Sequence, residues 1–81
     1  MRASKQTVAR VVEHRKARDA QVAEYEAQDT SEDPVARWYS ARRVASHYWH
    51  DVRHAPGFAS EPADYRAAIE DELYRDSNTG D

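Results

Sequence analysis

The sequence contains no cysteine and very little glycine, and each absence excludes a class of site. Without cysteine the chain has no disulfide, no thiol nucleophile and no thiolate ligand for a metal. Glycine occurs only at positions 57 and 80, so there is no glycine-rich loop of the kind that cradles phosphate. No apolar run reaches the roughly 18 residues of a membrane span, and residues 1–20 lack the apolar centre of a secretory signal. We therefore expect a soluble cytoplasmic protein, located in the host cytoplasm if its source is a virus.

Large aliphatic residues are scarce as well, because Val, Ile, Leu and Phe together account for only ten of the 81 residues. Such a composition borders on that of disordered chains, but the net charge is only −3 and eight residues are aromatic. We expect residues 1–81 to form a single small domain with a thin, aromatic core. Arginine outnumbers lysine ten to two, which indicates a GC-rich genome and, with the small size, suits a bacterial or bacteriophage protein.

Three helices and no strand are predicted, because no segment alternates with period two and helix-ending residues divide the chain. The expected helices cover about residues 5–28, 34–54 and 61–76, and a polar tail follows at 77–81. The predicted fold class is therefore all-α, a small three-helix domain.

Residues that favour helix starts precede each predicted helix. Ser4 or Thr7 is available as N-cap of the first helix. Asp33 is the expected N-cap of the second, with Pro34 at the first helical position. Ser60 is the expected N-cap of the third. These signals support the three boundaries independently of the apolar pattern.

The second helix has the clearest apolar stripe. Six residues fall within roughly 100° of arc on a helical wheel, namely Trp38, Ala41, Ala45, Tyr48, Trp49 and Val52. Each large aromatic side chain can remove about 150–250 Å² from water. We therefore expect both Trp38 and Trp49 to belong to the core.

The first helix has a poorer stripe, which leaves two alternatives open. Its apolar arc is Val8, Val11, Val12, Val22 and Tyr25, interrupted by Arg15, Arg18 and Asp19. In one alternative Arg15 or Arg18 pairs with Glu72, which sits in the apolar face of the third helix. In the other, much of the first helix projects and its apolar residues meet a partner or a second copy of the chain.

Charge alternates along the chain and also leaves two interpretations. Residues 1–18 carry +5, residues 19–36 carry −6, residues 37–54 carry +3 and residues 55–81 carry −5. The basic start can lie against the acidic third helix, or it can bind an external anion such as nucleic acid. The nucleic-acid candidates are Arg2, Lys5, Arg10, Arg15, Lys16 and Arg18.

A row of polar and aromatic residues is predicted opposite the apolar stripe of the second helix. Together with the two interrupting arginines, this row gives the partner-binding candidates Tyr39, Arg43, His47, His50, His54, Arg15 and Arg18. His50 and His54 are spaced i, i+4, which also permits a histidine metal site with a ligand from elsewhere. We expect no catalytic residue, because no acid, base and nucleophile are spaced to act together. We also expect no metal and no cofactor.

These features together favour a non-enzymatic protein–protein interaction module. We expect an accessory or inhibitory protein, or a minor component of a larger assembly, whose partner is another protein. Nucleic-acid binding by the basic first helix is the first alternative, and a histidine metal site is the second. Self-association through the first helix is a further expectation.

Overall fold

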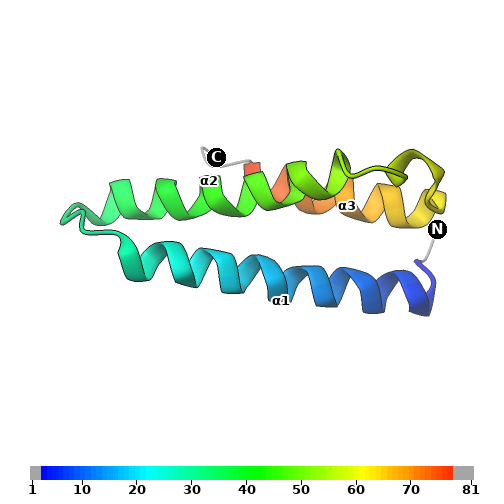
Figure 1. Cartoon of the computed structure of the whole chain (residues 1–81), viewed down its shortest axis with the longest axis horizontal. Coiled ribbons are helices and arrows are strands. Elements are labelled where there is room, and N and C mark those ends of the chain that lie inside the picture. Colours follow the sequence, from blue (N-terminus) through cyan, green and yellow to red (C-terminus); the bar gives the residue numbers. More distant parts are fainter. Residues whose placement is uncertain (1–2, 78–81) are drawn as a thin grey trace.

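The computed structural model describes residues 3–77, which form three α-helices and one short 3₁₀ turn. In chain order these are α1 (Lys5–Gln28), α2 (Pro34–Arg53), η1 (Phe58–Ser60) and α3 (Ala63–Ser77). α1 and α2 make a long antiparallel hairpin, and α3 runs back along the half of α2 that is remote from the α1–α2 connection (Figure 1). The predicted all-α, three-helix fold is confirmed. No helix of the described part combines the length and apolar character that a membrane crossing requires.

The starts of the first two helices follow from their caps. The Ser4 hydroxyl accepts a hydrogen bond from the Thr7 backbone N–H at 3.1 Å, so Ser4 is the N-cap of α1. The Asp33 carboxylate accepts from the Val35 N–H at 2.9 Å, and Pro34 occupies the first helical position of α2. Both starts agree with the sequence prediction.

The start of α3 differs from the prediction. Ser60 is the last residue of η1 and not the N-cap of α3, which begins at Ala63. The chain leaves α2 through Gly57, whose φ of 86° is the left-handed conformation that glycine adopts without strain. Residues 58–60 form the following 3₁₀ turn and are therefore not part of α3. At the start of α3 the Arg66 N–H donates a hydrogen bond to the Pro62 carbonyl at 3.0 Å. At the other end, the predicted polar tail is shorter, because Ser77 belongs to α3; residues 78–81 lie outside the described residues, as does Arg2.

The core lies where all three helices meet, around Trp49. Its side chain is completely buried, as is that of Ile69 on α3. The other buried apolar members of this cluster are Val11, Tyr65 and Leu73. One large residue from α2 therefore packs against one side of α3 and the first turns of α1, which confirms a thin core centred on an aromatic side chain.

The expectation that Trp38 belongs to the core is wrong. Trp38 is 48% exposed, although it lies on nearly the same side of α2 as Trp49. The reason is helix length: α2 has 20 residues and α3 only 15, or about 30 Å and about 22 Å. α3 reaches as far as Ser46, whose hydroxyl is 2.8 Å from that of Ser77, and ends before Trp38.

α1 lies along α2 (Figure 1), so the alternative in which much of it projects is wrong, although Val8 and Val12 of its apolar arc remain 52% and 38% exposed. Thr7 and Val11 on its N-terminal half are buried, with exposed fractions of 3% and 6%. Near the α1–α2 connection the burial is weaker, because Val22 is half-buried and Tyr25 is 37% exposed. The bundle thus has three helices at one end and two at the other.

The different positions of the two tryptophans predict different effects on stability. Trp49→Ala should lower the free energy of unfolding by about 3–5 kcal/mol, because it opens a cavity in the only large cluster of buried residues described. Trp38→Ala should lower it by less than about 1 kcal/mol, because the ring is half-exposed. Urea unfolding followed by circular dichroism measures both values. Equal losses for the two variants would contradict this description of the core.

Candidate interaction surface

The basic side chains of α1 lie against the acidic residues that follow α2. Arg10 donates two hydrogen bonds to Glu61, at 3.1 Å to Oε1 and 2.6 Å to Oε2, and this contact lowers the pKa of Glu61. Lys16 pairs with Glu13 on its own helix at 3.3 Å, and Lys5 is exposed. Together with the pairs described next, these contacts confirm the interpretation in which the basic and acidic blocks meet within the chain.

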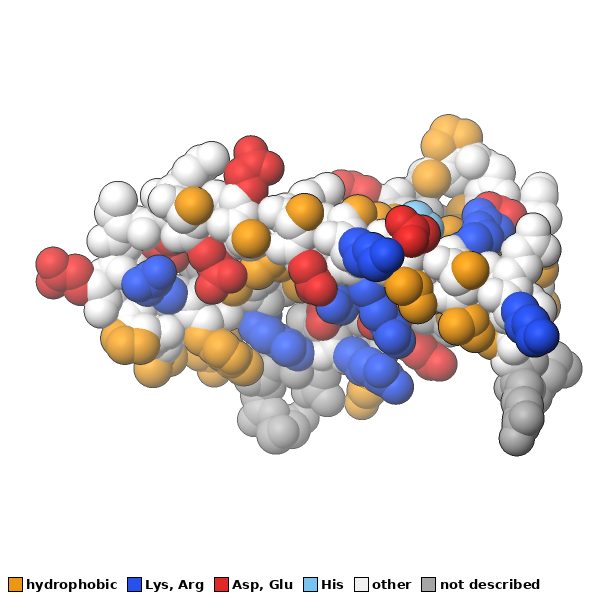
Figure 2. Space-filling model, turned by 90° about the horizontal axis from the view of Figure 1, so that it is seen from below, with side chains coloured by type: hydrophobic (Ala, Val, Ile, Leu, Met, Phe, Trp, Pro, Cys, Tyr) orange, Lys and Arg blue, Asp and Glu red, His pale blue; other side chains and the backbone are white. Residues whose placement is uncertain are grey.

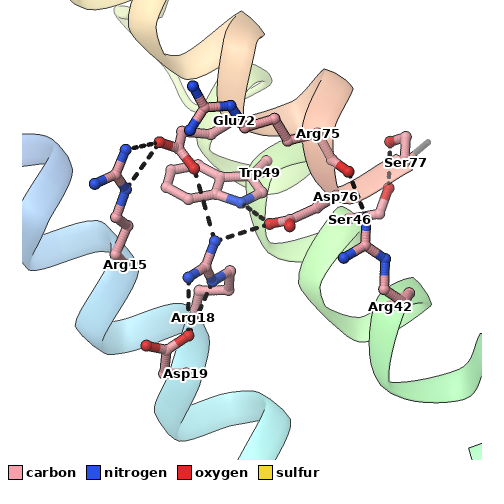
Figure 3. A network of polar contacts seen from close by, with 10 residues as sticks. All are labelled: Arg15, Arg18, Asp19, Arg42, Ser46, Trp49, Glu72, Arg75, Asp76 and Ser77. Atoms are coloured by element: carbon pink, nitrogen blue, oxygen red, sulfur yellow. Dashed lines mark hydrogen bonds and ion pairs between the residues drawn. The ribbon is translucent and has the colours of Figure 1, made fainter. Parts of the chain in front are cut away.

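A buried carboxylate joins α1 to α3 (Figure 3). Glu72 is only 5% exposed, and Arg15 Nε donates to its Oε1 at 2.8 Å. Arg18 Nη1 lies 3.7 Å from the other carboxylate oxygen of Glu72 and donates to Asp76 Oδ2 at 3.0 Å. The predicted pairing of Arg15 or Arg18 with Glu72 is therefore present for both arginines. Both candidate residues are thus brought to α3 and not to the polar row of α2.

Sequence reasoning missed the residue that completes this network. Asp76 also accepts a hydrogen bond from Trp49 Nε1 at 2.6 Å, so it links the core indole to Arg18 (Figure 3). A buried indole N–H needs an acceptor, and that requirement is visible in the sequence. The sequence did not indicate which residue is the acceptor, because that depends on the position and rotation of α3 relative to α2.

The polar row of α2 is present on its outer side. Tyr39, Arg43, His47 and His54 are exposed, and His50 is half-buried. The His50 and His54 rings stack, with centroids 6.2 Å apart and planes 9° apart. Within residues 3–77 no group of three His, Asp or Glu side chains is placed to hold a metal ion. The row is therefore available as a surface.

A histidine on α1 occupies a more enclosed position that the sequence did not single out. His14 Nδ1 is 2.7 Å from the Tyr48 hydroxyl, and His14 Nε2 is 2.9 Å from the Tyr65 hydroxyl. A neutral imidazole satisfies both contacts, with one ring nitrogen donating and the other accepting. Partial burial and the nearby charge of Arg10 both lower the pKa of His14. This cluster lies beside an open hollow of about 420 Å³ and ties α1 to α2 and α3.

The end of α2 near the α1–α2 connection carries a cluster of exposed apolar side chains. Val35, Trp38 and Tyr39 are 61%, 48% and 44% exposed and follow the i, i+3, i+4 spacing of one helix side. We call these three residues the hairpin-end patch. The Trp38 and Tyr39 rings meet edge to face, with centroids 5.0 Å apart, and the Arg42 guanidinium lies 5.5 Å from the Trp38 ring centroid. Half-exposed aromatic side chains beside arginine are typical of protein–protein interfaces.

The charges around this end of the molecule are of both signs. Hydrophobic side chains gather at the end that carries the α1–α2 connection, with acidic groups along the neighbouring helix and basic groups close by (Figure 2). Tyr25 of α1 lines a small hollow together with Ser40, Arg43, Val44 and His47, none of which belongs to the patch. The end of the hairpin therefore combines apolar, acidic and basic features within a small area.

Comparison with known proteins finds no matching family model, no similar curated protein and no similar solved structure.

The His14 contacts predict a loss of stability in mild acid. Because the pKa of His14 is lowered in the folded state, the unfolded chain binds the proton more readily, and stability falls as pH drops below the ordinary value of 6.5. One such group contributes a slope of at most about 1.4 kcal/mol per pH unit, and partial exposure of His14 makes the expected slope smaller. Urea unfolding at about pH 7.5 and about pH 5.5 measures this loss.

The matched variants for this measurement are His14→Gln and His47→Gln. His14→Gln is expected to be less stable at both pH values, because it loses ring contacts with two tyrosines. Its further loss between the two pH values should be smaller than that of the unaltered chain. His47 is exposed, so His47→Gln should keep the original pH dependence. An unchanged pH dependence in His14→Gln would show that His14 does not cause the effect.

Proposed function

We propose that this protein is a non-enzymatic protein–protein interaction module, which acts as an accessory or inhibitory component and binds its partner through the hairpin-end patch. The observation that supports this proposal is the half-exposed Trp38, which stands beside Tyr39 and beneath the Arg42 guanidinium. Trp, Tyr and Arg are the residues that most often supply the binding energy of an interface. The Trp38 ring lies outside the core and exposes apolar surface to water, which lowers solubility. A partner that covers the ring would remove this apolar surface from water.

The polar row of α2 extends the same surface. Tyr39 belongs to both, and Arg43 follows it one helical turn later on the outer side of α2. His47, His50 and His54 then continue away from the hairpin end. We assign Trp38 and Tyr39 to the centre of the contact and the histidines to its rim, where polar side chains remain in contact with water.

The contacts of the basic residues speak against nucleic-acid binding. Arg10, Arg15 and Arg18 each reach a carboxylate of the segment that follows α2, so phosphate would have to displace an existing ion pair. An acidic helix beside them would also repel a phosphate backbone. For the place of action we propose the cytoplasm of a bacterium or of a bacteriophage-infected host, from the arginine-rich composition and small size alone.

Removing the aromatic side chains of the patch should abolish partner binding without unfolding the chain. We expect a tagged chain to capture a stoichiometric protein from lysate of its native source, in the presence of nuclease and high salt. Trp38→Ala with Tyr39→Ala should reduce this capture at least tenfold, because each residue of a central cluster contributes more than about 1 kcal/mol. Mass spectrometry identifies and quantifies the captured protein.

Tyr74→Ala is the control, because Tyr74 is 71% exposed and lies on α3. It should capture the same protein as the unaltered chain. Circular dichroism should show that all variants keep their helical content. If the double variant still captured the protein, the contact would lie elsewhere on the surface. If nuclease abolished the capture by the unaltered chain, the result would favour the nucleic-acid alternative.

A further inference from the structure

The open hollow beside His14 lies at the end of the molecule that carries the α2–α3 connection, far from the hairpin-end patch (Figure 1). Its walls come from α1, from the last turns of α2, from the connection and from the start of α3. Tyr48, Phe58 and Tyr65 supply aromatic rings, and Val52 adds apolar surface. Its volume of about 420 Å³ is within the range of small-molecule sites, which combine apolar walls with a few polar groups.

The α1 side of this hollow already contains a cation in contact with an aromatic ring. The guanidinium carbon of Arg10 lies 3.7 Å from the centroid of the Tyr65 ring. Both terminal nitrogens of Arg10 donate hydrogen bonds to the Glu61 carboxylate. Ring, carboxylate and guanidinium therefore form a complete cation site within the chain.

The α2 side of the hollow has a ring and a carboxylate of its own. Tyr48, Asp51 and Val52 are spaced i, i+3, i+4, so they lie on one side of α2 and line the hollow together. The other charged residues that line it are Arg10 and Glu61, which neutralise each other. The carboxylate of Asp51 therefore gives the hollow a net negative charge.

The stability of the fold does not explain a carboxylate at position 51. Asp51 is exposed in the last turn of α2, where the partial negative charge of the helix end disfavours an acidic residue. The ion pairs described for residues 3–77 do not include Asp51. Of its basic neighbours, Arg53 pairs with Glu70 at 2.8 Å, and His54 Nδ1 lies 3.0 Å from the His50 carbonyl oxygen. An acidic residue that opposes the helix dipole without forming an ion pair indicates a role in binding.

The polar contacts of the hollow leave hydrogen-bond acceptors for a ligand. His14 lies between the hydroxyls of Tyr48 and Tyr65. Each phenol oxygen has two lone pairs, and its contact with His14 uses at most one of them. Burial lowers the pKa of His14 and raises the pKa of both tyrosines, so the imidazole is mainly neutral at pH 7 and does not repel a cation. Such shifted groups gather at binding and catalytic sites.

We propose that this hollow binds a small organic ammonium compound, with its charged nitrogen at the Asp51 carboxylate and its apolar body against the Tyr48 and Phe58 rings. The carboxylate is the counter-ion, the phenol oxygens accept N–H hydrogen bonds, and the aromatic rings attract the cation. The site goes beyond the proposed function, because it lies at the other end of the hairpin from Trp38 and Tyr39 and uses neither residue.

Nuclear magnetic resonance of the isotope-labelled full chain tests the proposal, with phenethylammonium as the probe. This compound carries one ammonium group on an apolar body. It should shift the backbone amide signals of Tyr48, Asp51, Val52 and Phe58 and saturate with a Kd of about 1–5 mM, an affinity within reach of so small a ligand. Phenethyl alcohol has the same body without the charge and should bind at least about fivefold more weakly.

Asp51→Asn removes the charge and keeps the size of the side chain. Because Asp51 is exposed and its side chain forms no described hydrogen bond or ion pair, this variant should keep the fold, which circular dichroism checks. It should bind phenethylammonium at least about fivefold more weakly than the unaltered chain. Asp71→Asn is the matched control, because Asp71 is exposed on α3 and does not line this hollow. The control should bind the probe as the unaltered chain does.

Two kinds of result would overturn the proposal. One is the absence of signal changes up to about 20 mM probe, or changes confined to residues that do not line the hollow. The other is equal affinity for the alcohol and the ammonium compound, or for the unaltered chain and Asp51→Asn, since Asp51 would then not select a cation. Neither result concerns the hairpin-end patch, so the capture experiment tests the proposed function separately.

Discussion

The burial of the Trp49 side chain of α2 against α1 and α3 is the interaction on which the rest of the structure depends. So few large apolar residues are present that one indole supplies much of the surface removed from water, and its N–H determines which acidic residue of α3 must face it. Asp76 meets that need and in turn receives Arg18 from α1. A single buried ring therefore positions both neighbouring helices, with the aid of ion pairs that would be weak if they were exposed.

The ion pairs explain how such a charged chain forms a core at all. Glu72 and Asp76, which face inward from α3, each have a guanidinium within reach, so their burial does not leave an isolated charge. Glu72 is the clearest case, because it is nearly as buried as Leu73 next to it. Near the α1–α2 connection this arrangement stops, and the aromatic side chain of Trp38 remains in contact with water.

The sequence predicted most of the fold and only part of the candidate surface. The caps at Ser4 and Asp33 and the pairing of Glu72 with α1 are local or charge-driven features, so they could be predicted from residue type and spacing. The exposure of Trp38 could not, because a helical wheel gives the side of a helix and not the point at which its neighbour ends. The contacts of His14 likewise depend on three helices converging, and nothing in its local sequence indicates this.

The unequal lengths of the helices also divide the molecule into parts of different local stability. Residues packed on Trp49 are expected to open only when the whole fold opens, because the described buried cluster surrounds them, whereas the two-helix end of the hairpin is held by few buried contacts. Its backbone amides are therefore expected to exchange with solvent through partial fraying, at a lower free-energy cost than those of the three-helix end. A surface with this property can adjust its side chains to a binding partner while the remainder of the bundle stays rigid.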